Sequence, residues 1–352
     1  MELALYDPAA GYYARGPWQV GRAGDFFTSV SVGPLFGQLL ARRCLRWRRD
    51  AGIAGRWRIL ELGAHDGTLA RDILTAMATL DPAAHAALEY AVAEPLDAMR
   101  QCQWRTLAAH RAAVRWVGTP HELAADPLPG IAIGNELLDA LPCHLITRHH
   151  RRWHHTGVAA DAENPGTLTW CDLGPATGAL AEAAARIDAS HLADGYRTEV
   201  RTNYAAIHAA LATALDPGHV IWIDYGFARP EYYDPARTEG TLRTFSRHRA
   251  GDDPLAAPGE ADITAHVDFT AVAEAAATAG FSLAAFQSQG AWLTREARDW
   301  LTSQETNPAA ATIRQFQTLT HPGHLGARFH VIELTTAGPA ATAAEAHRCG
   351  LQ

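Results

Sequence analysis

The chain has 352 residues, of which 48% are hydrophobic and 19% are charged, and its formal net charge is −8. This composition supports a packed core and excludes global disorder, and the negative charge argues against a general nucleic-acid binder, which needs a basic face. No apolar run reaches the length of a membrane span, the N-terminus lacks a signal pattern, and the five widely spaced cysteines form no CxxC pair. We therefore expect a cytoplasmic protein whose thiols stay reduced.

The N-terminal segment, residues 1–34, is rich in Gly, Pro and aromatic residues. This predicts an irregular arm rather than a helix or strand, with its aromatic side chains packed on the main domain. Residues 34–49 then show the apolar spacing of an amphipathic helix with a strongly basic end, which suits the negative end of the helix dipole. We expect residues 1–50 to form an arm and a helix that pack on a core domain of residues 51–352.

The most informative segment is residues 58–69, where an apolar run ends in Glu61-Leu62-Gly63 and Gly67 precedes a helical pattern. A buried parallel strand that turns sharply into a helix has this pattern. Gly63 permits the turn and the approach of a ligand, and Gly67 lets the start of the helix lie close to the strand. Dinucleotide-dependent enzymes and S-adenosylmethionine (SAM) methyltransferases both bind their cofactors at such a turn. A tight turn without a ligand is the structural alternative.

Strands and helices alternate after this turn, as in a doubly wound α/β sheet. The predicted strands cover about 57–62, 88–94, 114–117, 130–136 and 219–226, the predicted helices about 67–80, 95–109 and 268–279, and the two final strands, 281–286 and 328–334, form an antiparallel edge hairpin. Two segments interrupt this order. Residues 144–217 begin with a residue pattern typical of a β-strand and continue as alanine-rich predicted helices. Residues 227–266 show little hydrophobic periodicity. Insertions at the carboxyl ends of strands four and five would lie over the crevice in which such sheets bind ligands.

Glu94 closes the second predicted strand. A carboxylate at this position is suited to accept hydrogen bonds from both hydroxyls of an adenosine ribose, whereas a 2′-phosphate would require an arginine. A solvent-exposed acid at a strand end is the alternative interpretation.

Polar residues also end strands four and five. Asn135 and Glu136 directly follow an apolar strand, Asp139 comes three residues later, and Asp224 ends the next strand. Because the carboxyl ends of parallel strands meet at one edge, these side chains should face the crevice. A carboxylate such as Glu136 can orient a guanidinium through two hydrogen bonds and make one nitrogen a better nucleophile. Asp139 could instead cap the following turn, and Asp224 could belong to a structural ion pair.

The histidines raise the possibility of a metal site. They cluster at His149, His150, His154 and His155, but alternation along a strand would divide them between two faces, and no cysteine or acid accompanies them. A solvated basic hairpin is the favoured interpretation, and we expect no metal. The chain contains no nucleophilic serine motif and no Walker loop.

Five blocks together resemble the MidA-like family of SAM-dependent methyltransferases, which includes a mitochondrial protein-arginine methyltransferase that acts on a subunit of respiratory complex I during its assembly. The blocks are residues 5–13 with 24–29, 61–69, 135–142, 224–226, and 240–248 with 262–269. They occur in order over nearly the whole chain, and their combination is far more specific than any single glycine pattern.

The resemblance implies a class I methyltransferase fold, that is, a Rossmann-like doubly wound sheet with an irregular N-terminal arm and insertions at about 144–217 and 227–266. It implies SAM as the cofactor, bound at the strand-one turn. The implied catalytic residues are Glu136, Asn135, Asp139 and Asp224. The implied cofactor-binding residues are Glu61, Gly63, Gly67, Glu94, Asn135, Gly24, Asp25 and Thr28. The implied substrate-binding residues are Asp262, His266 and Asp268. We expect a methyltransferase that acts on a protein by arginine N-methylation, as a homodimer and without a nucleic-acid or membrane partner.

Three departures from the family pattern leave alternatives open. His65 occupies the middle of the turn, where the family has glycine, although histidine tolerates a left-handed backbone better than most residues. The acid that follows Thr28-Ser29 in the family is absent, and the chain begins almost on Leu5, which indicates a truncated start. A non-catalytic assembly protein with the same fold is therefore one alternative. An NAD-dependent oxidoreductase is the other, although no Tyr/Lys or His/Asp pair for hydride transfer is recognisable.

Overall fold

The computed structural model describes residues 1–15, 28–164, 166–246, 249–303, 309–336 and 351. Its helices are α1 (Glu2–Tyr6), α2 (Leu35–Asp50), α3 (Thr68–Leu80), α4 (Pro82–Ala86), α5 (Asp97–Thr106), α6 (Gly178–Ala184), α7 (Tyr204–Ala214), α8 (Arg229–Tyr232), α9 (Phe269–Thr278), α10 (Gln289–Glu296), α11 (Arg298–Ser303) and α12 (Ala310–Thr320). Its 3-10 helices are η1 (Tyr12–Arg15), η2 (Val30–Val32), η3 (Ala108–Ala113) and η4 (Pro120–Leu123). Its strands are β1 (Trp57–Leu62), β2 (Leu88–Ala93), β3 (Val114–Val117), β4 (Leu128–Asn135), β5 (His144–His149), β6 (Arg152–Ala160), β7 (Leu168–Pro175), β8 (Arg197–Val200), β9 (Leu215–Phe227), β10 (Arg243–Ser246), β11 (Arg249–Gly251), β12 (Asp262–Thr264), β13 (Val267–Asp268), β14 (Ser282–Ser288) and β15 (Phe329–Thr335).

The central sheet has the strand order β14-β15-β9-β4-β1-β2-β3, with the short β13 paired to β9. Strands β9, β4, β1, β2 and β3 run parallel, whereas β15 is antiparallel to both β9 and β14. The chain moves outward from β1 in both directions, so β1 and β4 flank the point where the strand order reverses. The loops diverge at such a point and leave a crevice outside the carboxyl ends of the strands. The predicted class I methyltransferase sheet is confirmed.

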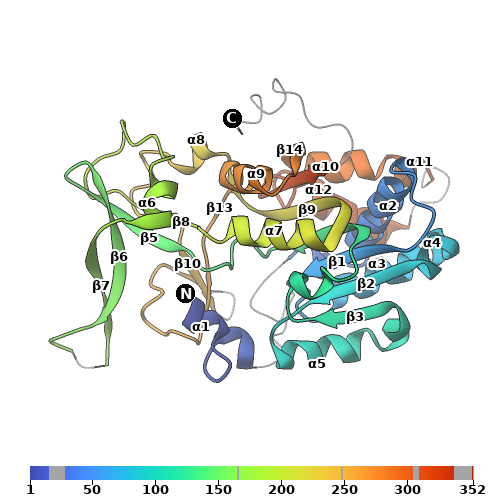
Figure 1. Ribbon diagram of the computed structural model, residues 1–352, viewed down its shortest axis with the longest axis horizontal. Helices are drawn as coiled ribbons and strands as arrows, with labels where there is room; N and C mark the ends of the chain where they lie inside the picture. The colour runs from blue at the N-terminus through green and yellow to red at the C-terminus, as the bar shows by residue number, and fades with distance from the viewer. Residues whose placement is uncertain (16–27, 165, 247–248, 304–308, 337–350, 352) are drawn as a thin grey trace.

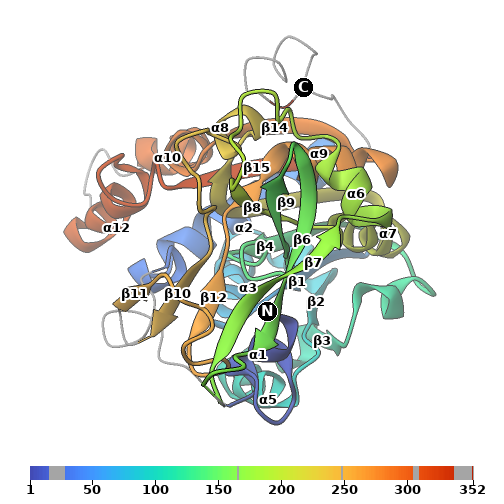
Figure 2. The ribbon, with the colours of Figure 1, turned by 90° about the vertical axis from the view of Figure 1, so that its left-hand side faces the viewer.

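Helices cover both faces of this sheet (Figure 2). One face packs against α2, α3, α10 and α12, and the other against α7 and α9. Every side chain of β1 is buried, and successive residues such as Ile59 and Leu60 enter the two different cores. This is the burial expected of a central parallel strand, whose side chains alternate between two covered faces.

The segment after β4 forms a separate antiparallel sheet with the order β7-β6-β5-β8, which projects from one end of the molecule (Figure 1). A third, smaller core lies beneath it, with Ile146, Leu180 and Tyr196 among its members. The segment after β9 is also ordered, with α8 and a small sheet of order β11-β10-β12. These strands are only three or four residues long, and β10 pairs with a strand well separated in sequence, as in Arg243 with Thr264, so the periodicity within one strand gave little sign of them.

Two expectations about helices were wrong. The N-terminal arm is not wholly irregular, because α1 and η1 lie within it, and the Asp7 carboxylate accepts hydrogen bonds from the amides of Ala9 and Ala10 at 2.9 Å each in the turn between them. No helix was predicted after the one at about 268–279, but α10, α11 and α12 follow α9 between β14 and β15. The final two strands are antiparallel neighbours as predicted, but helices connect them instead of a tight turn.

The basic end of α2 also differs from the expectation. Arg43 is buried and forms an ion pair with Glu333 of β15, and Arg46 pairs with Glu296 of α10. The helix dipole therefore does not explain these two arginines. Among the described residues, no helix has both the length and the apolar character required to cross a membrane.

Candidate functional site

The turn after β1 alternates left-handed residues. Gly63, His65 and Gly67 have φ values of 69°, 46° and 84°. A Cβ at Gly63 would lie 2.9 Å from Leu137 Cδ1, and one at Gly67 would lie 3.3 Å from Gln103 Cα, so a side chain at either position would be crowded as well as strained in φ. His65 adopts the left-handed region without being a glycine, so the departure from the family pattern leaves the shape of the turn intact.

Glu94 follows β2 and is only 6% exposed. Its Oε1 accepts a hydrogen bond from the Leu96 amide at 3.0 Å, and its Oε2 accepts one from Gln103 Nε2 at 3.0 Å. Burial raises the pKa of this carboxyl, and the two hydrogen bonds oppose that shift. The same Gln103 Nε2 donates to the carbonyl of His65 at 3.0 Å, which links the acid to the turn. The alternative of a solvent-exposed strand-end acid is therefore wrong.

The end of β4 brings Asn135 and Glu136 to the crevice. Glu136 is left-handed with a φ of 52°, its amide donates to the Ile223 carbonyl at 2.8 Å, and its Oε1 accepts from Asn135 Nδ2 at 2.9 Å. Burial, together with the nearby charge of Asp139, raises the pKa of Glu136 to about 8, although hydrogen bonds from Asn135 and from the Ser29 backbone oppose the shift. The buried Asn135 Oδ1 has no hydrogen-bond partner among the described residues.

Asp224 and Asp139 fix the turn that follows Glu136. The Asp224 Oδ2 accepts hydrogen bonds from the Leu138 amide at 2.7 Å and the Asp139 amide at 3.2 Å. Burial raises the pKa of Asp139 to about 6 and raises that of Asp224 well above its ordinary range. Among the described residues, no arginine or histidine forms an ion pair with either acid or with Glu136. The structure thus gathers the carboxyl groups of Asp139, Asp224 and the partly exposed Glu136, none of which forms an ion pair with a described residue, although the charge of Arg201 lowers the pKa of Asp139.

Arg201 holds the walls of this crevice together. Its guanidinium donates to the carbonyls of Asp139 and Leu141, and also to those of Ala265 and His266, at 2.7–3.1 Å. The turn after β4 and the segment before β13 are therefore tied through one buried side chain. The sequence analysis missed this arginine because its partners are backbone carbonyls, which leave no pattern of residue types.

The N-terminal arm closes over the same region. The Tyr6 hydroxyl donates to the Ala140 carbonyl at 2.9 Å, the Tyr13 hydroxyl donates to Asp262 Oδ1 at 2.9 Å, and the two rings stack with centroids 5.5 Å apart. These tyrosines were not predicted as site residues, although the conspicuous block of residues 5–13 contains them. Thr28 lies in a turn where its Oγ1 accepts from the Ser31 amide at 3.2 Å. Gly24 and Asp25 lie outside the described residues.

The remaining predicted residues have separate environments. Asp268 accepts a hydrogen bond from the Ala271 amide at 3.1 Å as the cap of α9 and pairs with Arg229 at 3.3 Å. His266 packs its ring on Phe227, with centroids 5.3 Å apart, and its buried Nδ1 has no partner in the described part of the chain. Burial and the neighbouring arginines lower the pKa of His266 to about 4.

Glu61 lies below the turn, inside the sheet layer. Its Oε2 accepts a hydrogen bond from the Tyr90 hydroxyl at 2.6 Å. It is 2% exposed, and burial raises its pKa to about 7. This carboxyl group is therefore hydrogen-bonded to a neighbouring strand, and among the described residues no hydrogen bond links it to the turn. The expected contact of Glu61 with the cofactor stays a prediction.

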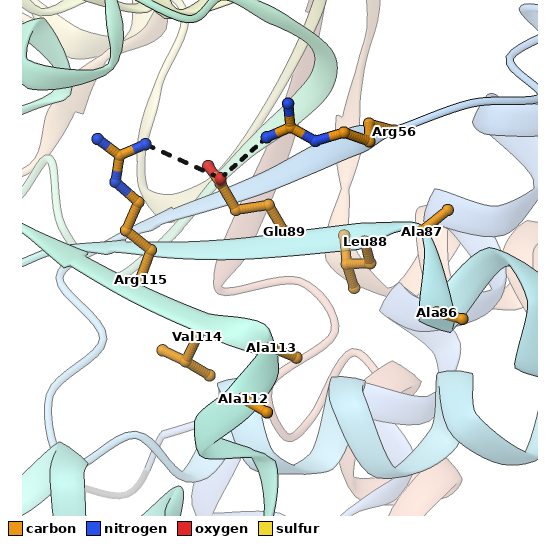
Figure 3. A pocket seen from close by; sticks show the side chains of 9 residues that line it. All are labelled: Arg56, Ala86, Ala87, Leu88, Glu89, Ala112, Ala113, Val114 and Arg115. Atoms are coloured by element: carbon orange, nitrogen blue, oxygen red, sulfur yellow. Dashed lines mark ion pairs between the residues drawn. The ribbon is translucent and has the colours of Figure 1, made fainter.

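A cavity of about 380 Å³ lies elsewhere in the fold, lined by residues near the starts of β2 and β3 (Figure 3). There the Glu89 carboxylate lies 3.6 Å from Arg56 and 3.8 Å from Arg115. Ligands of an open parallel sheet bind outside the carboxyl ends of its strands, and this cavity is at the opposite edge. Among the residues with described coordinates, no group of three or more His, Cys, Asp or Glu could hold a metal ion.

Comparisons with known proteins agree with this geometry. Residues 39–287 match the family described as S-adenosyl-L-methionine-dependent methyltransferase. The protein arginine methyltransferase NDUFAF7 of Danio rerio is 28% identical to this chain over 94% of it and 80% of its own length. The human protein of the same name is 28% identical over 77% of this chain and 63% of its own length. A crystal structure of a Burkholderia thailandensis protein bound to S-adenosyl-homocysteine is 34% identical, with a TM-score of 0.82, and the match covers 96% of this chain and 87% of that chain.

The same relatives contradict one expectation. The Danio rerio, Drosophila melanogaster and human proteins are all named as mitochondrial, whereas the sequence analysis predicted a cytoplasmic protein. The cytoplasmic prediction is wrong by this comparison. Net charge and unpaired cysteines indicate only a compartment in which thiols stay reduced, and they do not distinguish one such compartment from another.

Proposed function

The chain belongs to the family of S-adenosyl-L-methionine-dependent methyltransferases, and from this premise we propose that it N-methylates an arginine side chain of a protein. Membership gives the activity class and the cofactor, SAM, and decides against the oxidoreductase and the non-catalytic assembly protein. The acceptor is the proposed part. It is supported by the relatives named as protein arginine methyltransferases and by the acidic character of the crevice.

We propose that SAM lies against the turn of Gly63 and Gly67, with its ribose hydroxyls on Glu94. The residues present fit such a ligand. Glu94 is a buried acceptor whose two oxygens are already oriented, and the unpartnered Asn135 Oδ1 lies at the neighbouring strand end, where it can accept a hydrogen bond from an ammonium or guanidinium N–H. SAM supplies a methyl group activated by a sulfonium, so the protein must mainly align the acceptor and exclude water.

The buried Glu136 carboxyl group carries the proposal of a guanidinium acceptor. It directly follows β4 and pairs with no cation in the described part of the chain. A buried ionised carboxylate is costly without a partner, and an incoming guanidinium would supply both the charge and the two parallel donors that match it. Asp139 adds negative potential beside it, which favours a cation over a neutral acceptor.

Glu136 can also receive the proton that the acceptor loses. Methylation of a guanidinium nitrogen requires that nitrogen to give up a proton, and a carboxylate oxygen held against it is within reach. Because burial raises the pKa of Glu136 to about 8, its carboxylate is a stronger base than an exposed one. Arg201 holds the turn in place without contacting the acceptor, since its donors are bound to carbonyls.

The arginine acceptor is tested by product analysis. The protein is incubated with tritiated SAM and a fractionated mitochondrial extract, and the labelled band is hydrolysed to amino acids. We expect labelled methylarginine. The chain contains no lysine, so labelled methyl-lysine could not arise from self-methylation and would contradict the proposal. Label in a base-labile methyl ester or only in small molecules would also contradict it.

The organisation of the chain remains a proposal too. We propose that residues 1–50 pack over a methyltransferase domain of residues 51–352, with insertions at about 144–217 and 227–266, and that Asp262 and His266 lie on the acceptor side. The hydrogen bond from Tyr13 to Asp262 supports this arrangement. The homodimer stays a prediction, which light scattering of the purified protein would check.

A further inference from the structure

Gln103 of α5 connects three elements around the proposed cofactor site. Its side chain has no exposure to solvent. Its Nε2 donates at 3.0 Å to both Glu94 Oε2 and the carbonyl of His65, and its Oε1 accepts from Trp116 Nε1 at 3.1 Å. The amide therefore joins the end of β2, the turn after β1 and strand β3, and all of its hydrogens are used.

The chemistry of the partners fixes the orientation of this amide. An indole N–H can only donate, so the atom facing Trp116 must be the amide oxygen. The opposite orientation would place that N–H against an NH2 group and would turn the amide oxygen towards the carboxylate of Glu94 and the carbonyl of His65. Only one of the two orientations satisfies all four groups.

Packing holds Gln103 at this distance from the turn. A Cβ on Gly67 would lie 3.3 Å from the Gln103 Cα and 3.4 Å from Leu107 Cδ1. That spacing is tighter than ordinary contact, so the absence of a side chain at Gly67 allows α5 to approach. The second glycine of the turn thus has an additional role: it admits the helix that carries Gln103.

We propose that Gln103 is a positioning residue, which aims the Glu94 carboxylate at the ribose hydroxyls of the adenosyl cofactor. The proposal rests on the cofactor site proposed above. One Glu94 oxygen is held by the Leu96 amide and the other by Gln103, so the carboxylate cannot rotate about its terminal bond without losing a hydrogen bond. Each oxygen keeps a lone pair for the ligand. An acceptor that is already oriented binds more tightly than one that must be ordered by the ligand.

The decisive test compares two ligands in two variants. Gln103→Met keeps the length of the side chain and removes its polar atoms, and Gln101→Met makes the same change at an exposed position of the same helix. Calorimetry measures the affinity for S-adenosyl-homocysteine and for its 2′,3′-dideoxy analogue. If Gln103 acts through the ribose, Gln103→Met should lower the affinity for S-adenosyl-homocysteine by roughly 10- to 100-fold. It should lower the affinity for the dideoxy analogue by less than about threefold. Gln101→Met should change neither.

A double-mutant cycle with Glu94 tests the same pathway. In a Glu94→Ala background, Gln103→Met should cause no further loss of affinity, because the group it orients is gone. Equal losses for both ligands, or a full additional loss in that background, would overturn the positioning role and would leave the cofactor site standing. Failure of the unmodified protein to bind S-adenosyl-homocysteine would instead overturn the site itself.

A gentler variant keeps the inference testable if Gln103→Met does not fold. Trp116→Phe removes only the donor that fixes the amide oxygen and preserves an aromatic ring. This variant should lower the affinity for S-adenosyl-homocysteine about threefold, again with little change in the affinity for the dideoxy analogue. An unchanged affinity for both ligands would contradict the proposed orientation of the amide by Trp116.

Discussion

Two groups of buried carboxyl groups lie at different places in this fold, and their environments are opposite. On β15, between β14 and β9, Glu333 pairs with Arg43 and His219 through one oxygen and accepts hydrogen bonds from Trp292 at 2.6 Å and Arg295 at 2.9 Å through the other. These partners outweigh burial and hold the pKa of Glu333 well below its usual range. At the crevice, burial raises the pKa of Glu136 to about 8 because no cation compensates it.

Burial alone does not distinguish the two groups, since Glu333 is 2% exposed and Asp139 in the crevice is 6% exposed. The distinction lies in the partners. A buried carboxylate whose oxygens are all paired is part of the architecture, whereas an unpaired one is costly and is retained where a ligand completes it.

The largest effect on stability is expected at Glu333, whose two oxygens are both paired. Glu333→Gln removes the charge that compensates Arg43, and breaking a buried pair in this way costs about 3–5 kcal/mol of unfolding free energy. Urea denaturation measures the loss, with Glu163→Gln at an exposed position as the control. The affinity of the folded variant for S-adenosyl-homocysteine should not change. A loss below about 1 kcal/mol would show that pairing of both oxygens does not identify a carboxylate that stabilises this fold.

At Glu136, which has no ion-pair partner among the described residues, the pattern should reverse, so that activity falls and stability does not. Glu136→Gln keeps the shape and removes the charge that orients a guanidinium, so methyl transfer should fall by about 100-fold or more. The affinity for SAM should barely move and the melting temperature should not fall, because no ion pair is broken. A radiolabelled transfer assay beside a thermal melt measures both quantities. A large drop in stability with normal activity per folded molecule would show that Glu136, like Glu333, has a structural role.

Glu94 lies between these extremes, because both of its oxygens accept hydrogen bonds but only from neutral donors. Glu94→Ala leaves two ribose hydroxyls without a charged acceptor, which should cost roughly 1.5–3 kcal/mol of SAM binding. Calorimetry with SAM or S-adenosyl-homocysteine measures this change. Unchanged affinity, or a cofactor found elsewhere in a complex, would contradict the assignment.

The raised pKa of Glu136 should make both stability and activity depend on pH. The pKa of Glu136 is raised from 4.5 to about 8 in the folded state, so the folded protein holds a proton that the unfolded chain releases between these values. Stability should therefore fall as the pH rises from about 4.5 to 8, and Glu136→Gln should remove that slope. Because the ionised form binds the acceptor, kcat/KM should rise about tenfold per pH unit below 8 and then level off. A flat profile in the wild type would contradict the raised pKa.

Local pattern was sufficient for the sheet and for the ends of its strands. The bounds of β1 and β3 are those predicted, because short apolar runs between turn residues admit few other structures when both faces are covered. Glu94 and Glu136 were found for the same reason. A polar residue directly after a buried strand must lie at the edge of the sheet, whatever the rest of the chain does.

The sequence by itself therefore determined the alternation of strands and helices, the glycine turn and the acids that close β2 and β4. Only the tertiary structure decided what each acid is for. Glu333 meets Arg43, which is 290 positions away, Asp268 turns to cap α9, and Gln103 reaches Glu94 from the following helix. The charge on a carboxylate is set by the donors around it, and those donors come from segments that the fold, rather than the local sequence, brings together.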